Sequence, residues 1–349
     1  GSGGRNSIGV RGTFLKERFT EGCQLLSQCV TEPAFAPEEI ERTRTLVLEE
    51  LRARADNPAG LAFDLFNKCL WDQHPYRLDV LGNRESLMGA TPDRLRKFCD
   101  GMLTADGAVI SVVGAIEVER TLDLLEEMAA GLGRSEALRA PPGDELPLAA
   151  PRTARLVRDR AQAHIVLGYR GLSLNDPDRH ALELLCSVLS GQGGRLFLEL
   201  RDRQSLCYTV NAFSVEGIEP GSFTVYMGTS PEKVPQAIEG IDRMLAALCD
   251  EGITAAELAR AQRYLVGTHD IGLQRLGARA ATTALNELYG LGWDAHLGYA
   301  GRVEAVTLDD IRRVAQRLID PRGRVLALVG PDNTPGPEAD WRLEPEVMQ

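Results

Sequence analysis

Residues 91–114 read TPDRLRKFCDGMLTADGAVISVVG, and residues 307–330 read TLDDIRRVAQRLIDPRGRVLALVG. The two stretches align without a gap at an offset of 216 residues, which is 307 minus 91. Each begins with a threonine suited to cap a helix, continues with apolar residues at helical spacing, and ends in an apolar run closed by glycine. Long-period self-similarity of this kind indicates two copies of one fold. The identical positions include Thr91/Thr307, Asp93/Asp309, Arg96/Arg312, Gly107/Gly323 and Gly114/Gly330.

The second copy has the pattern of a complete domain. It follows a Pro-rich stretch, ALRAPPGDELPLAAPRT (137–153), whose composition suits an exposed linker. Strands next to one another in sequence, with helices in runs, predict an α+β domain with a largely antiparallel sheet and helices packed on one face. The predicted strands lie near 154–158, 162–170, 207–215, 221–228 and 324–329, and the helices near 176–190, 193–203, 231–250, 255–272, 277–290 and 308–319.

The same offset predicts that the first copy is incomplete. Subtracting 216 from 154, where the second copy starts, gives a negative number. We therefore expect the first strands of copy one, and its equivalent of helix 176–190, upstream of residue 1. The predicted division of the chain is 1–136 for the C-terminal part of a first domain, 137–153 for the linker, 154–335 for the complete second domain and 336–349 for a tail.

Composition restricts the class of partner. Of 349 residues, 44% are hydrophobic and 26% are charged, as in soluble globular proteins. A formal net charge of −11 argues against a nucleic-acid partner, because phosphate binding requires clustered basic residues. Seven scattered cysteines without a Cys-x-x-Cys pair favour buried thiols. No apolar run approaches the length of a membrane span.

Helix 37–55 is predicted to carry a carboxylate near its apolar face. On a helical wheel of about 100° per residue, Ile40, Val47 and Leu51 define that face, and Glu50 falls on its shoulder. A carboxylate there either reaches water, pairs with one of several nearby arginines, or binds a metal.

The stretch LRDRQSLCYTV (200–210) joins a predicted helix end to a β-leaning run. Arg201 and Tyr208 lie seven positions apart across this junction. That arrangement fits a plain helix–strand connection, or a guanidinium and a phenol that converge on one ligand. Cys207 is predicted to point the other way along the strand, into the core. Just upstream, Gly191, Gly193 and Gly194 are predicted to form a turn. The alternative is a phosphate-binding loop.

The order and spacing of these motifs resemble the pitrilysin or insulinase-type zinc metallopeptidases, whose members include mitochondrial processing peptidase. In copy one the resemblance rests on the Glu50 helix, Asn57-Pro58, His74-Pro75-Tyr76 and VISVVG. In copy two it rests on QAHIVLGYRG, GGRLFLELRDRQSLCYTV and VLALVG, so it covers most of the chain. The resemblance implies a tandem of processing-peptidase-like α+β domains that face each other as two halves of a clamshell.

A zinc site in the first domain of an active unit is implied by the same resemblance. Two histidines and a general base would come from His-x-x-Glu-His on one helix, and a further ligand from a later glutamate, which Glu50 matches. Thr43 stands where active members often have an acidic residue. The sequence contains no His-x-x-Glu-His, so the histidine ligands of the zinc are expected outside this chain.

Arg201 and Tyr208 match the family's Arg and Tyr of the second domain, which reach across the cleft toward the peptide at the zinc. A guanidinium and a phenol can donate hydrogen bonds to a developing oxyanion or to neighbouring carbonyls. Arg203 lacks the matching spacing and is predicted either to be solvated or to form a salt bridge that involves no phosphate. His180, unpaired in the equivalent helix of copy two, is predicted to lie on the helix surface and not to bind metal.

Two functions follow from the resemblance. In the first, the chain is part of a zinc-dependent metalloendopeptidase that cleaves peptides within a chamber. Arg201 and Tyr208 supply catalytic and substrate contacts, Glu50 is a candidate zinc ligand, and the isolated chain is inactive. In the second, favoured by Thr43, the chain is a non-catalytic half or subunit that binds substrate or scaffolds an active metallopeptidase. The expected partners are a peptide or small protein substrate and a partner domain or subunit, in bacterial cytoplasm or periplasm.

Overall fold

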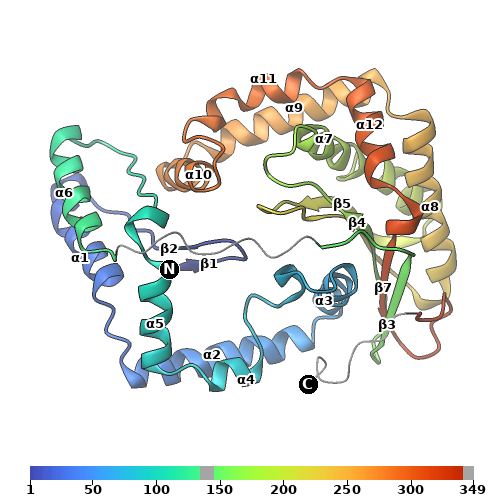
Figure 1. The fold of residues 1–349 in the computed structure, drawn as a ribbon. Coiled ribbons are helices and arrows are strands. Elements are labelled where there is room, and N and C mark those ends of the chain that lie inside the picture. Colours follow the sequence, from blue (N-terminus) through green and yellow to red (C-terminus); the bar gives the residue numbers. More distant parts are fainter. Residues whose placement is uncertain (134–144, 341–349) are drawn as a thin grey trace. The chain divides into compact units, whose positions relative to one another are not determined.

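The computed structural model describes residues 1–133 and 145–340, which form two compact units (Figure 1). The first unit comprises Gly1–Arg52, Val80–Pro141 and His269–Gly298, and the second comprises Ala53–Asp79, Pro142–Thr268 and Tyr299–Gln349. Each unit thus combines segments from both predicted copies. The division of the sequence at 137–153 stays a prediction. Residues 134–144, which include the start of the predicted linker, and residues 341–349 of the predicted tail lie outside the described residues.

Within residues 145–340, the second unit contains a five-stranded mixed sheet of order β3–β7–β4–β6–β5. Strands β3 and β7 are parallel, whereas the other neighbouring strands pair antiparallel. The predicted α+β class is confirmed, and each predicted strand of copy two is present within a few residues of its expected bounds. These strands are β3 (Arg152–Val157), β4 (Ala163–Arg170), β5 (Cys207–Val215), β6 (Ser222–Thr229) and β7 (Val325–Gly330).

Helices of copy two cover one face of this sheet, as predicted (Figure 1). Alternate residues of β4 divide between the faces: Ile165 and Leu167 enter the core beneath these helices, and Val166 enters the core on the opposite face. The helices of this region are α7 (Arg179–Leu189), α8 (Val234–Glu251), α9 (Ala255–Gly272), α11 (Tyr299–Glu304) and α12 (Leu308–Leu318). The predicted cap of α12 is confirmed, because Thr307 Oγ1 accepts a hydrogen bond from the Asp310 N–H at 3.2 Å.

The opposite face of the sheet is covered by α3 (Pro58–Leu70). This helix comes from copy one and packs on the second face of the sheet, where Phe66 and Leu70 join Val166 and Ala327 in a separate core. The physical reason is visible in β7, whose six residues are all buried. A strand without polar alternation needs both of its faces covered.

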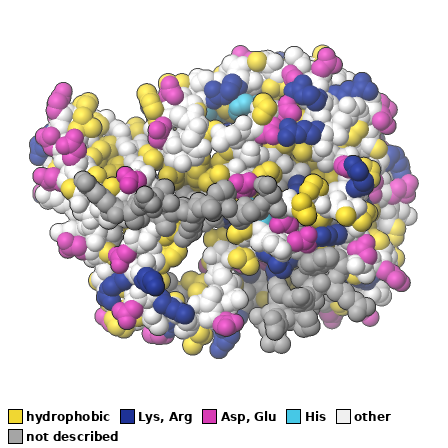
Figure 2. Space-filling view, viewed as in Figure 1, with side chains coloured by type: hydrophobic (Ala, Val, Ile, Leu, Met, Phe, Trp, Pro, Cys, Tyr) yellow, Lys and Arg dark blue, Asp and Glu magenta, His cyan; other side chains and the backbone are white. Residues whose placement is uncertain are grey.

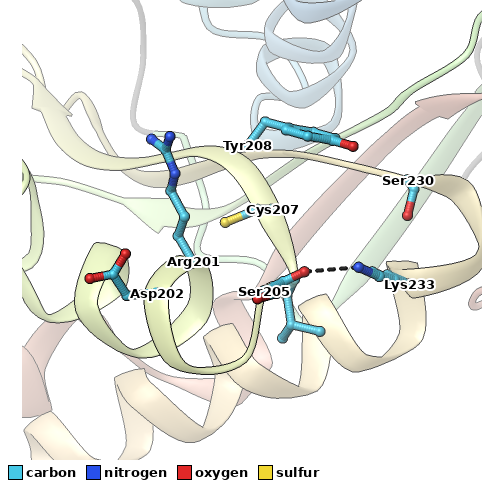
Figure 3. Close-up of a pocket in the computed structure, with 8 residues that line it drawn as sticks. Arg201, Asp202, Ser205, Cys207, Tyr208, Ser230 and Lys233 are labelled. Carbon is cyan, nitrogen blue, oxygen red and sulfur yellow. Dashed lines mark hydrogen bonds between the residues drawn. The ribbon is translucent and has the colours of Figure 1, made fainter.

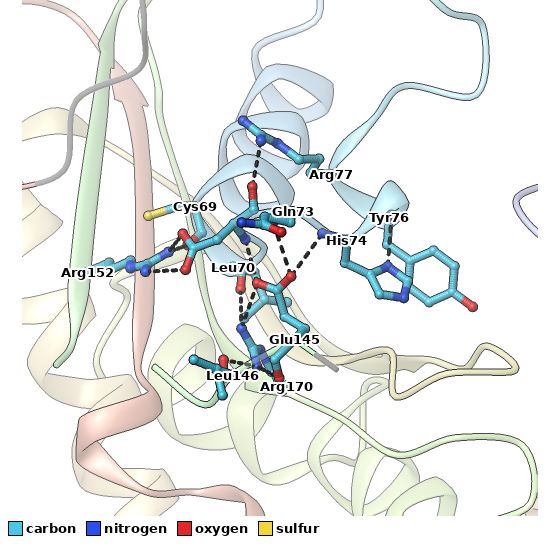
Figure 4. Close-up of polar contacts among 11 residues, drawn as sticks. Cys69, Leu70, Gln73, His74, Tyr76, Arg77, Glu145, Leu146, Arg152 and Arg170 are labelled. Carbon is cyan, nitrogen blue, oxygen red and sulfur yellow. Dashed lines mark hydrogen bonds and ion pairs between the residues drawn. The ribbon is translucent and has the colours of Figure 1, made fainter. Parts of the chain in front are cut away.

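A polar cluster, here called the Glu145 cluster, ties the loop after α3 to the sheet (Figure 4). The Glu145 carboxylate accepts hydrogen bonds from the backbone N–H groups of Asp72 (2.6 Å), Gln73 (3.1 Å) and His74 (2.9 Å). It also pairs with Arg170 at 3.2 Å. Burial raises the pKa of Glu145, but these N–H donors and Arg170 together bring it below its ordinary value.

Two arginines of the sheet complete the cluster. The Arg170 guanidinium lies 4.8 Å from the centre of the Trp71 ring. Arg152, on β3, donates to both carboxylate oxygens of Asp72 at 2.7 and 2.9 Å and to the carbonyl of Cys69. Bidentate pairs of this kind fix orientation as well as distance. The loop that ends α3 is therefore held to β3 and β4 by charge-assisted contacts.

The first unit is mainly helical, with α1 packed on α6. Its helices are α1 (Phe19–Thr31), α2 (Pro37–Ala55, whose last residues belong to the second unit), α4 (Arg84–Met88), α5 (Pro92–Met102), α6 (Val118–Ala130) and α10 (Leu276–Leu288). A short ribbon joins β1 (Ser2–Gly3) to β2 (Ile8–Gly9). The 3₁₀ turns of the two units are η1 (Lys16–Arg18), η2 (Pro75–Arg77), η3 (Ala105–Gly107), η5 (Pro231–Lys233), η6 (Ala295–Gly298) and η7 (Pro321–Gly323).

The strand predicted for VISVVG in copy one is not formed. Its helix is present as α5, and Thr91 caps it by accepting from the Arg94 N–H at 3.3 Å. Residues 109–114, however, do not pair with any strand among the described residues. The reason is that a β-strand is stabilised by hydrogen bonds to a neighbouring strand and not by its own sequence alone.

Basic side chains are interspersed with acidic ones over the face shown in Figure 2. In the part of the chain that the structure describes, every helix is too short or too polar to cross a membrane. Of the seven cysteines, Cys23, Cys69, Cys186 and Cys207 are buried, Cys99 and Cys249 are half-buried, and Cys29 is exposed.

We expect Glu145→Gln to lower the free energy of unfolding by about 1–3 kcal/mol at neutral pH, because three N–H groups lose an ionised acceptor. The exposed Glu251→Gln is the control. Since the folded-state pKa of Glu145 is lowered, its stabilisation exists above the unfolded pKa and is lost as the pH falls through the folded pKa. Urea unfolding at neutral pH and near pH ~3 measures both effects. Equal losses at the two pH values would contradict this role.

Candidate functional site

Arg201 and Tyr208 line one hollow of about 440 Å³ on the second unit (Figure 3). Arg201 is exposed, and Tyr208 keeps 64% of its surface exposed. In Figure 3 both side chains stand clear of the turn that joins them, and the phenol oxygen is directed toward the Ser230 end of the hollow. The hollow is lined by Arg201, Asp202, Ser205, Leu206, Cys207, Tyr208, Ser230 and Lys233.

A π-helical segment, η4 (Phe197–Arg203), carries Arg201. The sequence predicted an ordinary helix over 193–203. Instead, the Gln204 N–H bonds to the Glu199 carbonyl at 3.1 Å, and the Leu206 N–H bonds to the Leu200 carbonyl at 2.8 Å, five and six residues back. Apolar spacing over two turns cannot separate α from π geometry, and π segments are frequent at functional sites. The wider turn sets the direction in which Arg201 leaves the backbone.

A β-bulge presents Tyr208. The pairing of β5 with β6 shifts register between Cys207, opposite Thr229, and Thr209, opposite Gly228. Tyr208 is therefore an extra residue in the strand, and bulges of this kind redirect side chains next to active sites. The predicted inward direction of Cys207 is confirmed, since this residue is 8% exposed and belongs to the core.

The predicted glycine turn before η4 is confirmed. Gly191 has a φ of +77°, and the Gly194 N–H bonds to the Gly191 carbonyl at 3.0 Å. At Gly194 a Cβ atom would lie 2.2 Å from the Ser190 carbonyl oxygen, so any side chain there would displace backbone. The chain can enter η4 in this path only because residue 194 lacks a Cβ.

An ion pair fixes the start of the same segment. Arg195 donates to both carboxylate oxygens of Glu257 at 2.6 and 2.8 Å, and to the Gly252 carbonyl at 3.0 Å. The hydrogen bonds from Arg195, with smaller contributions from Thr254, lower the pKa of Glu257 to about 2. Thr254 and Glu257 also form the predicted capping box of α9.

Two residues that were not predicted from the sequence, Phe197 and Lys233, contact residues that line the hollow. The Arg201 guanidinium lies 4.7 Å from the centre of the Phe197 ring, a cation–π contact one helical turn away. Residues four apart on a helix are neighbours, so the spacing of Phe197 and Arg201 could have indicated this contact from the sequence. Lys233, from the turn before α8, donates to the Ser205 carbonyl at 2.9 Å. The predicted salt bridge of Arg203 is confirmed, with Glu199 at 2.9 Å.

Glu50 lies on α2, and its predicted place on the shoulder of a buried face is wrong. Glu50 is exposed, and α2 has no buried side chain among its residues; Val47 and Leu51 are only half-buried. The helical wheel identifies an apolar stripe but not what covers it. In the described residues no group of three or more His, Cys, Asp or Glu side chains is placed to hold a metal ion.

The helix of copy two that corresponds to the expected zinc helix, α7, instead carries a closed polar network. His180 is half-buried, not on the surface as predicted; its Nδ1 lies 3.3 Å from Glu183. Its Nε2 lies 3.3 Å from the Arg302 guanidinium. The Tyr299 hydroxyl donates to Glu183 at 2.5 Å. Each ring nitrogen of His180 thus faces a protein group, and that this histidine is not a metal ligand stays a prediction.

Comparisons with known proteins agree with this architecture. A family model described as the peptidase M16 inactive domain matches residues 89–265. The uncharacterized zinc protease YmxG of Bacillus subtilis is 27% identical over 319 residues, covering 91% of this chain and 76% of that protein. An uncharacterized zinc protease of Streptomyces coelicolor is 28% identical over 314 residues, covering 86% of this chain and 67% of that protein.

Solved structures show the same fold. A peptidase M16 inactive domain from Pseudomonas fluorescens superposes with a TM-score of 0.82 at 20% identity, covering 92% of this chain and 77% of that one. A protease from Helicobacter pylori gives 0.80 at 19% identity, with 90% and 77% covered. The chain therefore belongs to the M16 peptidases, the insulinase or pitrilysin type of zinc metallopeptidase family. The expected resemblance is thereby confirmed.

We expect Gly194→Ala to destabilise the second unit by about 1–3 kcal/mol, because the added methyl group overlaps the Ser190 carbonyl. Gly193→Ala is the matched control, since a Cβ there meets nothing within 4 Å. Thermal unfolding of both variants measures the difference. Equal stability of the two variants would show that the chain can enter η4 by another path.

Proposed function

We propose that the chain is part of a zinc-dependent metalloendopeptidase that cleaves peptides inside a closing chamber, and that it supplies Arg201 and Tyr208 as substrate contacts. One observation carries the proposal. A guanidinium and a phenol, from a π-helical segment and a β-bulge, are both exposed in one polar hollow of an M16 fold. Arg201 and Tyr208 are exposed and lie on irregular backbone, so they contribute little to the stability of the fold. Their placement therefore fits a role in binding.

The chemistry of the pair suits a peptide backbone. Arg201 carries five N–H donors in a planar fork. The Tyr208 hydroxyl donates one hydrogen bond. When a scissile carbonyl is attacked, negative charge develops on its oxygen, and donors aimed at this oxygen or at adjacent carbonyls stabilise the transition state more than the ground state.

In the proposal, the zinc histidines lie outside this chain and Glu50 is a candidate further ligand. Glu50 is exposed, and within the described residues it belongs to no group of three or more His, Cys, Asp or Glu side chains placed to hold a metal ion. Since a catalytic zinc takes three protein ligands, the described residues do not fit the complete site. We therefore assign no reaction step of the metal to the residues of this chain. Their role in the proposal is to bind and orient the peptide.

The pair can be tested in the zinc-loaded assembly that contains this chain. We expect Arg201→Ala and Tyr208→Phe each to lower kcat/KM for a reporter peptide by about 10²–10³-fold, the usual loss for one oxyanion donor. Thermal unfolding should be unchanged, because both side chains are exposed. Arg203→Ala is the matched control and should retain activity, since its partner Glu199 lies on the same helical segment. Full activity in both Arg201 and Tyr208 variants would refute the proposal.

The alternative is a non-catalytic half that binds substrate or scaffolds an active metallopeptidase, which Thr43 and the exposed Glu50 favour. Zinc analysis and peptide hydrolysis separate the two. We expect the isolated chain to hold well under one zinc ion and to be inactive, while the assembly hydrolyses peptide and loses this activity when Arg201 is removed. An assembly whose activity does not depend on Arg201 or Tyr208 would favour the scaffold.

A further inference from the structure

The turn between Arg201 and Tyr208 has an unfavourable backbone conformation. Ser205 has a φ of +52°, and among the described residues the only other non-glycine with a positive φ is Phe35. A serine in the left-handed region is disfavoured by contact of its Cβ with the backbone. Such a residue persists only where its surroundings hold it in place.

The surroundings hold this turn at both of its peptide carbonyls. Lys233 Nζ donates to the Ser205 carbonyl at 2.9 Å, as the dashed line in Figure 3 marks. Thr229 Oγ1 donates to the Leu206 carbonyl at 2.5 Å, and Thr229 is fully buried. These donors follow one another closely in sequence, at the end of β6 and in the turn before α8.

The N–H groups of the same two residues are bonded to the π-helical segment. The Ser205 N–H donates to the Arg201 carbonyl at 3.1 Å, and the Leu206 N–H donates to the Leu200 carbonyl at 2.8 Å. All four polar backbone groups of the turn are thus engaged, two by the segment that carries Arg201 and two by residues 229 and 233. The backbone between Arg201 and Tyr208 is fixed from outside by Thr229 and Lys233.

Lys233 is the contact that can be changed without opening the core. Thr229 is buried within the sheet, whereas Lys233 is half-buried at the rim of the hollow. Lysine is rare in this chain, at residues 16, 68, 97 and 233 alone, while arginine provides nearly all the positive charge. Glu232 is exposed beside it, and the Ser230 hydroxyl bonded to Glu232 lowers the pKa of that carboxyl, so this acid is charged next to Lys233. With Glu232 beside it, the Lys233 ammonium group still donates to the Ser205 carbonyl.

We propose that Lys233 is a positioning residue for the Arg201/Tyr208 pair: its hydrogen bond to the Ser205 carbonyl holds the left-handed turn that sets these two side chains relative to each other. The inference rests on the proposed function of the pair. Lys233 itself need not touch substrate. Its effect is expected on the alignment of donors in the transition state, where small displacements have large consequences.

Two measurements test the proposal, each on Lys233→Met, Lys233→Arg and the control Arg243→Met. Arg243 is an exposed cation of α8 that pairs with Glu239 on the same helix. In the isolated chain, amide hydrogen exchange at Ser205 and Leu206 should accelerate about ten-fold in Lys233→Met, because these amides close the turn. It should stay unchanged in Arg243→Met and return toward wild type in Lys233→Arg, whose guanidinium can donate to the same carbonyl.

In the zinc-loaded assembly, Lys233→Met should lower kcat about ten-fold with KM within about two-fold, and Lys233→Arg should restore most of the loss. Unchanged exchange at Ser205 and Leu206 in Lys233→Met overturns the proposal, and so does faster exchange with an unchanged kcat. Failure of the proposed function is distinguishable, because it appears as full activity of both Arg201→Ala and Tyr208→Phe. If only this inference fails, Arg201→Ala still loses activity. The thermal midpoint of Lys233→Met, compared with Arg243→Met, identifies any loss of folded protein.

Discussion

The burial of both faces of β7 is the constraint on which the second unit depends. Six consecutive buried residues in the central part of a sheet require an apolar layer above and below. Copy two supplies one layer through α7, α8 and α12, and copy one supplies the other through α3. Copy two alone therefore does not supply both apolar layers that cover the sheet. The Glu145 cluster secures this arrangement, because it holds the end of α3 against β3 and β4.

The candidate site is built on the edge of that sheet, where irregular backbone is tolerated. β5 is an edge strand, and its bulge at Tyr208 leaves the pairing among the other four strands undisturbed. The π-helical segment lies just before β5 and is fixed at its start by Arg195 and Glu257. Its last turn is fixed by Thr229 and Lys233. A rigid sheet thus presents two exposed side chains on strained local backbone, an arrangement that favours binding precision over stability.

Local patterns in the sequence predicted much of this fold. Alternation of apolar residues located the strands of copy two and placed Cys207 inside. The capping box at Thr254 and the helix cap at Thr307 could be predicted from the sequence alone. What failed depends on contacts between distant residues. The run VISVVG has the composition of a strand but no pairing neighbour in the described residues, and Glu50 lies on a stripe that no element covers deeply. The cover of the second face by α3 could have been inferred from VLALVG, which lacks polar alternation.

The site itself was predictable only in part. Arg201 and Tyr208 were selected by resemblance, and the structure brings both to one hollow. The π geometry, the bulge and the turn at Ser205 could not be predicted, because each arises from a one-residue change in hydrogen bonding that leaves the apolar pattern intact. The contact of Lys233 with the turn could not be predicted either, because Lys233 is remote in sequence from Arg201. In copy two, His180 and Glu183 are engaged with each other and with Tyr299 and Arg302.

The most direct test of the central claim is to map where a bound peptide contacts this chain. A non-cleaved substrate peptide with a photoreactive phenylalanine analogue beside the scissile position would be cross-linked in the zinc-loaded assembly and located by mass spectrometry. The account predicts cross-links within residues 197–208, competed by unlabelled substrate. Competed cross-links that lie in this chain only outside that segment would contradict it, because Arg201 and Tyr208 would then not be at the reacting bond.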